Sequence, residues 1–130
     1  GYGPTESYLD KHHATAFGRY KTTPESNHVS YLKPQENGSH YGCREVKVAN
    51  SSDCFTVQSY TPFSMNVSPY SQEELGSKKH QYDLEKSGST ILCVDYKMSG
   101  VGSNSCGPAL KAQYRLNETE WDWAISLQIH

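Results

Sequence analysis

The feature that most constrains this chain is a period-two alternation of apolar and polar residues, because successive side chains of a β-strand point to opposite faces. Residues 121–129 show it most clearly, and residues 110–116 repeat it, with the polar residues 117–120 between them. The pattern predicts a C-terminal β-hairpin. The apolar positions of its second strand are expected to face the core: Trp121, Trp123, Ile125, Leu127 and Ile129.

Further strands are predicted along the rest of the chain. Residues 91–94 are continuously apolar, which is typical of a central strand covered on both faces. The other candidates are residues 45–48, 55–58, 63–68 and 82–84, with 14–22 as a weaker one. One short helix is expected near 71–76, where Ser71 has capping-box spacing and Gly76 can end the helix. The fold class predicted is all-β, an antiparallel β-sandwich forming a single domain over residues 1–130.

Length and charge exclude several classes of protein. The 130 residues suit one domain, and the net charge of −2 argues against a nucleic-acid groove, which needs a basic excess. No stretch approaches the ~20 apolar residues of a membrane span. The chain begins with Gly rather than Met, so we expect an excised or processed segment.

The residue types that carry chemistry give no catalytic or metal pattern. Glu6 and Asp10 are interpreted as hydrogen-bonding loop residues rather than an acid/base pair. Glu73 and Glu74 are interpreted as helix-capping residues. Neighbouring side chains on a strand point apart, so His12 and His13 are not expected to share a metal ion.

The four cysteines show no metal or redox spacing. They form no CxxC pair and lack histidines at zinc-ligand spacing: Cys43, Cys54, Cys93 and Cys106. Two disulfides are arithmetically possible, but a domain of this size does not need them, so a reduced intracellular protein is expected. Cys54 and Cys93 lie within strand patterns and are predicted to be core thiols. Cys106 lies in a polar, glycine-rich loop with no base nearby in sequence, so it is not a proposed nucleophile.

Four segments, in order, together resemble a known family. Residues 3–11 are similar to a G-P-x-E-x-Y-x-D-R run, with Lys11 in place of the final Arg, and residues 33–38 with 44–46 resemble P-Q-E-N-G…R-[EW]. Residues 60–75 resemble F-x-F-N-x-S-x-Y-S-x-x-x-L, and residues 95–108 a D-x-x-x-M…S-[WC]-x-P loop. These are the motifs of glycoside hydrolase family 2 β-galactosidases, which hydrolyse terminal non-reducing β-D-galactose from β-galactosides such as lactose.

The resemblance implies a place for this chain in a larger enzyme. Such enzymes have about five domains, and two glutamates in a TIM-type barrel catalyse a retaining hydrolysis. The chain would be the C-terminal portion of the last, galactose mutarotase-like sandwich domain, the small-chain region, with no catalytic residue and inactive alone. Its partners would be the barrel, the remaining domains or a large subunit, and the β-galactoside. Magnesium and sodium sites would belong to the barrel, and the enzyme would be cytoplasmic.

The resemblance also implies which residues reach substrate. Some relatives carry a Trp at the position of Cys106, and that Trp stacks on the sugar in the aglycone subsite. The substrate-binding residues expected from the same loop are Gly102, Asn104, Ser105 and Cys106. Because Cys106 offers no aromatic face, stacking should be weaker here.

Two other classes of function remain open from the residues. A free-standing carbohydrate-binding module would stack sugars on exposed aromatics, for which Trp121 and Trp123 are candidates. A secreted structural or adhesive sandwich is compatible with the even cysteine count and with sequons such as Asn117-Glu118-Thr119.

Overall fold

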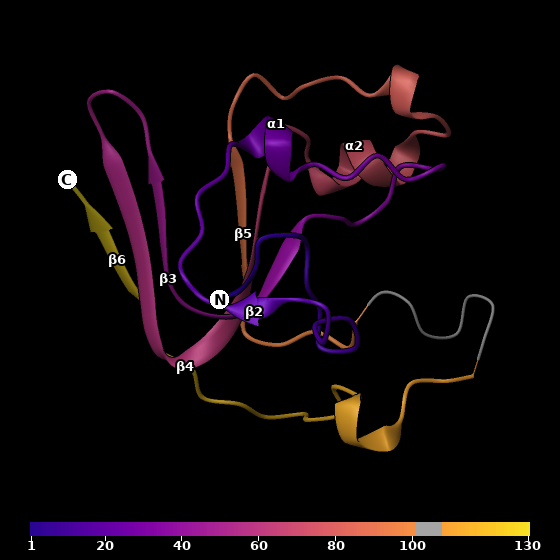
Figure 1. Cartoon of the computed structure of the whole chain (residues 1–130), viewed down its shortest axis with the longest axis vertical. Helices are drawn as coiled ribbons and strands as arrows, with labels where there is room; N and C mark the ends of the chain where they lie inside the picture. Colours follow the sequence, from indigo (N-terminus) through magenta and orange to yellow (C-terminus); the bar gives the residue numbers. More distant parts are fainter. Residues whose placement is uncertain (101–107) are drawn as a thin grey trace.

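The computed structural model describes residues 1–100 and 108–130. Its main element is a long antiparallel pair, β3 (Ser39–Ala49) with β4 (Cys54–Ser68) (Figure 1). The other edge of β4 is shared, since β5 (Ile91–Asp95) pairs with its second half and β6 (Ser126–Ile129) with its first half. The strand candidates at 45–48, 55–58 and 63–68 are therefore confirmed, the last two as parts of one strand.

The core lies along the β3–β4 pair. Its buried members come from both strands: Cys43, Val46, Val57 and Phe63. Half-buried apolar side chains pack around them, including Leu92 of β5 and Trp123. The alternation of the sequence thus sets the inner face of the sheet.

The β3–β4 pair changes register between His40 and Glu45. Gly42, between His40 and Cys43, has a φ of 71°, a conformation that an L side chain rarely adopts, and Pro62 of β4 lies in the second irregularity, between the pairs Cys43–Phe63 and Glu45–Gln58. Proline is confined to edges and bulges in sheets, so the second irregularity accommodates Pro62. Figure 1 shows β4 bending at this level.

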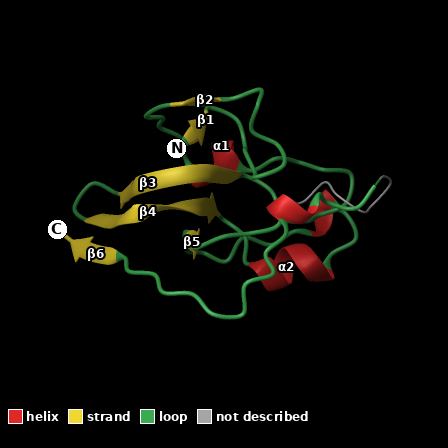
Figure 2. Cartoon of the chain, turned by 90° about the horizontal axis from the view of Figure 1, so that it is seen from below, coloured by secondary structure: helices red, strands yellow, loops and turns green. Residues whose placement is uncertain are grey.

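A second, two-stranded antiparallel sheet joins β1 (Tyr2–Gly3) to β2 (Ala16–Phe17). It lies over β3, while α2 lies on the other side of the large sheet (Figure 2). The all-β antiparallel prediction is confirmed, and the weak strand candidate at 14–22 becomes the two residues of β2.

The helices are short. Helix α2 (Gln72–Ser77) is the predicted one, and Ser71 caps it by accepting a hydrogen bond from the backbone N–H of Glu74 at 3.1 Å. Gly76 lies inside this helix instead of ending it. Helix α1 (Pro24–Asn27) was not predicted, although its Thr23 cap followed by proline is a recognised start signal. Among the described residues, no helix is long and apolar enough to cross a bilayer.

The predicted C-terminal hairpin is wrong. Residues 110–116 contain the 3₁₀ helix η2 (Ala112–Tyr114), and only β6 remains of the second strand. Strand β6 pairs with residues Phe55–Gln58 of β4, where the edge beyond β5 is open. The sequence pattern predicted that residues 110–116 would pair with this strand, but its partner is the open edge of β4.

The predicted core face of residues 121–129 is also wrong for the described chain. Only Trp123 is half-buried, with its ring 6.3 Å from that of Phe63. Leu127 is 57% exposed and Ile129 79% exposed. Apolar and polar residues still alternate along β6, but within the described residues nothing covers the side that carries Leu127 and Ile129.

Two further strand predictions need correction. Residues 91–94 form β5, but they are half-buried, because β5 lies at an edge of the sheet and not at its centre. The candidate at 82–84 falls in the 3₁₀ helix η1 (Gln81–Asp83).

Candidate functional site

The four predicted substrate-binding residues, Gly102, Asn104, Ser105 and Cys106, lie outside the described residues. The segment that the structure leaves out is 101–107, and the residues on either side of it, Gly100 and Pro108, are described. Both lie near one turn of the N-terminal region, residues 8–11. The candidate site is therefore built around this turn.

The turn is held closed by its own backbone. The N–H of Tyr8 donates to the carbonyl of Lys11 at 2.9 Å, and the N–H of Lys11 donates to the carbonyl of Tyr8 at 3.0 Å. The Tyr8 side chain is fully buried, so the turn is fixed to the body of the protein. Asp10 projects from this turn, and its carboxylate lies against Gly100.

A hollow of about 220 Å³ adjoins the turn. It combines a carboxylate, an imidazole, an ammonium group and a phenol, all groups that hydrogen-bond to hydroxyls. Its lining comes from the turn region and from the chain after Pro108: Leu9, Asp10, His13, Pro108, Ala109, Leu110, Lys111 and Tyr114.

Glu6 lies beneath the turn and is only 7% exposed. Its carboxylate accepts hydrogen bonds from Lys11 Nζ at 2.6 Å, from the Gly38 N–H at 2.9 Å and from the Tyr31 hydroxyl. The Tyr8 hydroxyl donates to it more weakly, at 3.4 Å. Glu6 thus ties residues 3–11 to residues 33–38, two of the segments that carry the family resemblance.

The ionisation of Glu6 follows from these contacts. Burial alone would raise the pKa of the carboxyl group, but the hydrogen bonds from Lys11, Tyr31 and Gly38 lower the pKa below its usual value. Glu6 is therefore an anion at neutral pH and is fully engaged in structure. The interpretation of Glu6 as a hydrogen-bonding loop residue is confirmed.

A second buried network explains why residue 38 is a glycine. Gly38 has a φ of 72°, and a Cβ there would lie 2.6 Å from the carbonyl oxygen of Asn27. The amide of Asn27 donates to the carbonyls of Gly38 at 2.7 Å and Val67 at 3.1 Å. His40 Nε2 lies 2.8 Å from Asn27 Oδ1, so this network joins α1 to β3 and β4. Sequence reasoning missed it because its partners are distant along the chain.

His12 and His13 lie side by side, with ring centroids 4.5 Å apart. The argument that strand geometry separates them is wrong, since both lie in a loop. His12 Nδ1 lies 3.0 Å from the carbonyl of Tyr8 and its ring packs on Tyr2 and Tyr41. In the described part of the chain, no three His, Cys, Asp or Glu residues converge as metal ligands would.

The described cysteines are free thiols: Cys43, Cys54 and Cys93. Cys43 is the one in the core, where burial raises the pKa of its thiol. Cys54 and Cys93 are half-buried, so their prediction as core thiols is only partly met.

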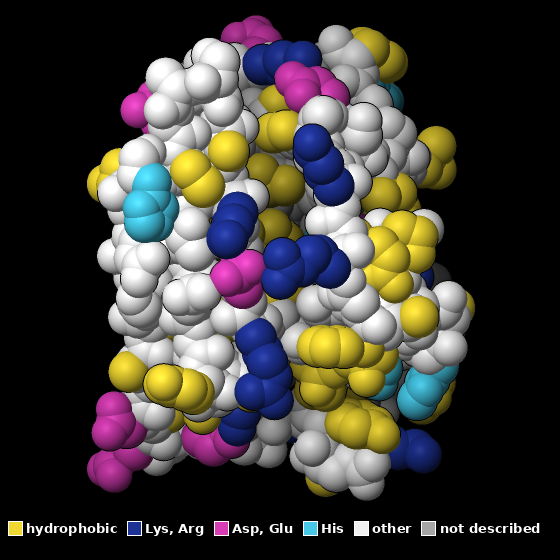
Figure 3. Space-filling model, turned by 60° about the vertical axis from the view of Figure 1, so that its left-hand side comes forward, with side chains coloured by type: hydrophobic (Ala, Val, Ile, Leu, Met, Phe, Trp, Pro, Cys, Tyr) yellow, Lys and Arg dark blue, Asp and Glu magenta, His cyan; other side chains and the backbone are white. Residues whose placement is uncertain are grey.

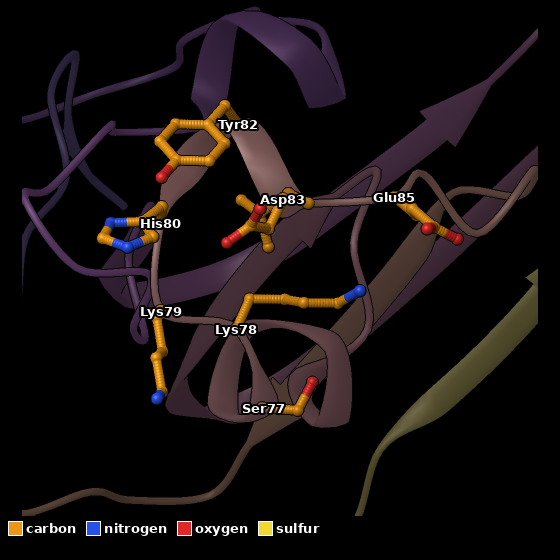
Figure 4. A pocket seen from close by; sticks show the side chains of 8 residues that line it. Ser77, Lys78, Lys79, His80, Tyr82, Asp83 and Glu85 are labelled. Carbon is orange, nitrogen blue, oxygen red and sulfur yellow. The ribbon is translucent and has the colours of Figure 1, made fainter.

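A larger, shallow hollow of about 600 Å³ follows α2 (Figure 4). The His80 and Tyr82 rings stack beside it with centroids 4.9 Å apart. Side chains of both charge signs line it, namely Lys78 and Lys79 together with Asp83 and Glu85. It shares no lining residue with the hollow at the Asp10 turn, and the sequence analysis did not single it out.

The face around β6 carries exposed apolar side chains. Figure 3 turns the β6 side of the molecule forward and shows hydrophobic side chains interspersed with Lys and Arg. Trp121 is 57% exposed, and its ring stacks with that of Tyr96 at 6.3 Å.

Comparison with known proteins gives a consistent result. Residues 1–129 match a family model described as the β-galactosidase small chain. A β-galactosidase of Actinobacillus pleuropneumoniae is 59% identical over 121 residues, which cover 93% of this chain and 12% of that protein. A β-galactosidase of Staphylococcus xylosus is 38% identical over 98% of this chain and 13% of that protein. A β-galactosidase of Kluyveromyces lactis is 34% identical over 98% of this chain and 12% of that protein.

The chain thus spans 12 to 13% of the length of these relatives, so their other domains have no counterpart in it. The family match runs through the motifs at 3–11, 33–38, 60–75 and 95–108. Because this match extends over nearly every residue, the chain belongs to the β-galactosidase small-chain family.

Proposed function

We propose that this chain is a non-catalytic part of a retaining β-galactosidase that removes terminal β-D-galactose from β-galactosides such as lactose. The observation that carries this proposal is the small-chain family match over residues 1–129. A retaining glycosidase needs two carboxyl groups about 5 Å apart, both free to act on substrate. Glu6, the most buried carboxylate among the described residues, is instead committed to structural hydrogen bonds, which supports the non-catalytic role.

The partner proposed is the rest of the same enzyme, including its catalytic barrel. The exposed apolar side of β6 supports this, since Leu127 and Ile129 would otherwise remain in water. The proposed magnesium and sodium sites belong to the barrel, as the family resemblance implies. The free thiols of Cys43, Cys54 and Cys93 support a cytoplasmic location.

The specific role proposed is to complete the aglycone subsite with Gly102, Asn104, Ser105 and Cys106. The placement of Gly100 and Pro108 at the Asp10 turn supports it, because one rigid turn then adjoins both ends of the segment. Holding a disaccharide in a productive orientation contributes to rate even without catalytic groups.

The test is the variant Cys106→Trp in the complete polypeptide. A ring at this position should stack on the second sugar and lower the KM for lactose by about two- to tenfold. Cys106→Leu is the matched control, since it adds apolar volume without an aromatic face. If both variants have the KM of the parent enzyme, residue 106 does not contact substrate and the subsite role is wrong.

A carbohydrate-binding module is the second candidate, favoured by the exposed Trp121–Tyr96 stack. Calorimetry of the chain with galactose and lactose separates the two. Binding at millimolar concentration or better that is lost in Trp121→Ala would favour the module.

A further inference from the structure

The hollow of about 600 Å³ that follows α2, which we call the α2 hollow, carries side chains that the fold does not use. Its volume is that of a small-molecule site. Five of its lining side chains have no hydrogen-bond or ion-pair partner within the described part of the chain: Lys79, His80, Tyr82, Asp83 and Glu85. Asp83 is half-buried, so its carboxylate gains from a ligand that donates hydrogen bonds to it.

The α2 hollow is held in shape by contacts outside it. Glu74 of α2 accepts the backbone N–H of Glu85 at 2.7 Å, which fixes one end of the turn. The side-chain amide of Gln81 donates to the carbonyl of Tyr31 at 2.8 Å and its oxygen lies 3.1 Å from His28 Nε2. A ligand that binds here does not have to order the turn first, which lowers the cost of binding.

An aromatic face lies beside the polar groups of the α2 hollow. The His80 and Tyr82 rings stack with centroids 4.9 Å apart and with an angle of 10° between their planes. Tyr82 is 82% exposed, so the ring face that is turned away from His80 is open. Figure 4 shows the Asp83 carboxylate on the same side of the turn as these rings. This arrangement fits a pyranose, whose C–H face packs on a ring while its hydroxyls reach polar side chains.

The charges that line the α2 hollow favour a neutral ligand. Lys78 and Lys79 are balanced by Asp83 and Glu85. A phosphate group or a nucleic acid would need an excess of positive charge, which these lining residues do not supply. A hydroxyl both donates and accepts, so a polyhydroxylated ligand can use the ammonium and carboxylate groups at once.

We propose that the α2 hollow binds a neutral carbohydrate, with one pyranose ring stacked on Tyr82 and its hydroxyls hydrogen-bonded to Asp83 and Lys79. This site goes beyond the proposed function, because it takes no part in hydrolysis and uses no residue of the segment 102–106. It holds carbohydrate at the surface of the protein and thereby raises the local concentration of sugar.

The test is photo-labelling of the complete polypeptide with a thio-linked lactose that carries a diazirine, a probe that resists hydrolysis. Peptides that contain residues 77–85 should be labelled, and an excess of unlabelled thio-linked lactose should remove the label. Tyr82→Ala should lower the labelling by about three- to tenfold, because the stacking face is lost. Tyr82→Phe keeps that face and should retain the label.

Tyr60→Ala is the matched control, because Tyr60 is 98% exposed but does not line the α2 hollow. It should leave the labelling unchanged. Asp83→Asn keeps the size of the side chain and removes the charge that strengthens its hydrogen bonds to hydroxyls, so it should lower the labelling by about threefold.

Three results would overturn the proposal. The first is an absence of label on residues 77–85, and the second is equal labelling of the parent, Tyr82→Ala and Asp83→Asn. The third is removal of the label by an excess of a free zwitterionic amino acid as effectively as by lactose, since the site would then recognise paired charges and not hydroxyls.

The same experiment separates this inference from the proposed function. If the complete polypeptide does not hydrolyse galactosides, the proposed function fails, and the labelling still decides whether the α2 hollow binds carbohydrate. If the polypeptide hydrolyses them while residues 77–85 stay unlabelled, only this inference fails. Label on a peptide that contains Trp121 instead would place the carbohydrate on the Trp121–Tyr96 stack and would also overturn it.

Discussion

Replacing Glu6 by glutamine should lower the free energy of unfolding of the chain by about 2–4 kcal/mol at neutral pH. The substitution keeps the size and shape of the side chain. It removes the negative charge that accepts hydrogen bonds from Lys11, Tyr31 and Gly38, and it turns one acceptor oxygen into a donor. At least one of these three donors must then face another donor.

The magnitude follows from the burial of each partner. The Gly38 N–H is buried, and a buried donor left without an acceptor costs about 1–3 kcal/mol. The Tyr31 hydroxyl loses a hydrogen bond to a charged acceptor, which contributes a similar amount. Lys11 adds at most about 1 kcal/mol, because its side chain is 58% exposed and solvent screens the ion pair.

Urea denaturation followed by tryptophan fluorescence measures the effect, with Trp123 as a half-buried reporter. Glu120→Gln is the control, because Glu120 is exposed, and it should change stability by less than about 0.5 kcal/mol. A loss in Glu6→Gln no larger than that of the control would refute the account of the Glu6 network.

The pH dependence gives an independent check. The hydrogen bonds hold the pKa of folded Glu6 below its ordinary value of 4.5. Its stabilisation is therefore complete above about pH 4.5 and is lost as the pH falls through the lower folded value. The difference between the parent chain and Glu6→Gln should shrink as the pH falls below 4.5, and a difference that grows there would contradict this sign.

Three further predictions concern the core, the thiols and α2. Phe63→Ala should cost about 3–5 kcal/mol of unfolding free energy, because the ring is 1% exposed in the main core; a loss below 1 kcal/mol in urea denaturation would argue against that core. Cys43 should react with a thiol reagent more slowly than Cys54, because it is buried and burial raises its pKa; mass spectrometry of labelled peptides gives the order, and equal rates would contradict it. Ser71→Ala should cost about 1 kcal/mol, because it removes the cap of α2; calorimetric unfolding measures this, and an unchanged Tm would show that the cap does not contribute.

The sequence predicted the parts of the fold that depend on local pattern. Alternation at 55–58 and 63–68 predicted two parts of β4, the strand in which the structure buries Val57 and Phe63, and Ser71 marked the start of α2. These features depend on neighbours within a few residues. The motifs likewise predicted the family, because their order and spacing can be read directly along the chain.

Strand partners could not be predicted in the same way. Alternation at 121–129 specifies which side chains share a face, but the partner of β6 is the open edge of β4, about 70 residues earlier. The same limit applies to Glu6, whose partner Gly38 lies 32 positions away. Nor could the contact between Asp10 and Gly100 be anticipated, since these two residues are far apart along the chain.

The hydrolysis of 2-nitrophenyl β-galactoside, measured with and without this chain, tests the central claim most directly. The rest of the proposed enzyme, produced without this chain, should be inactive or nearly so, and this chain alone should give no turnover. Mixing the two should restore hydrolysis. Turnover by the pure chain, or full activity of the polypeptide without it, would contradict the account.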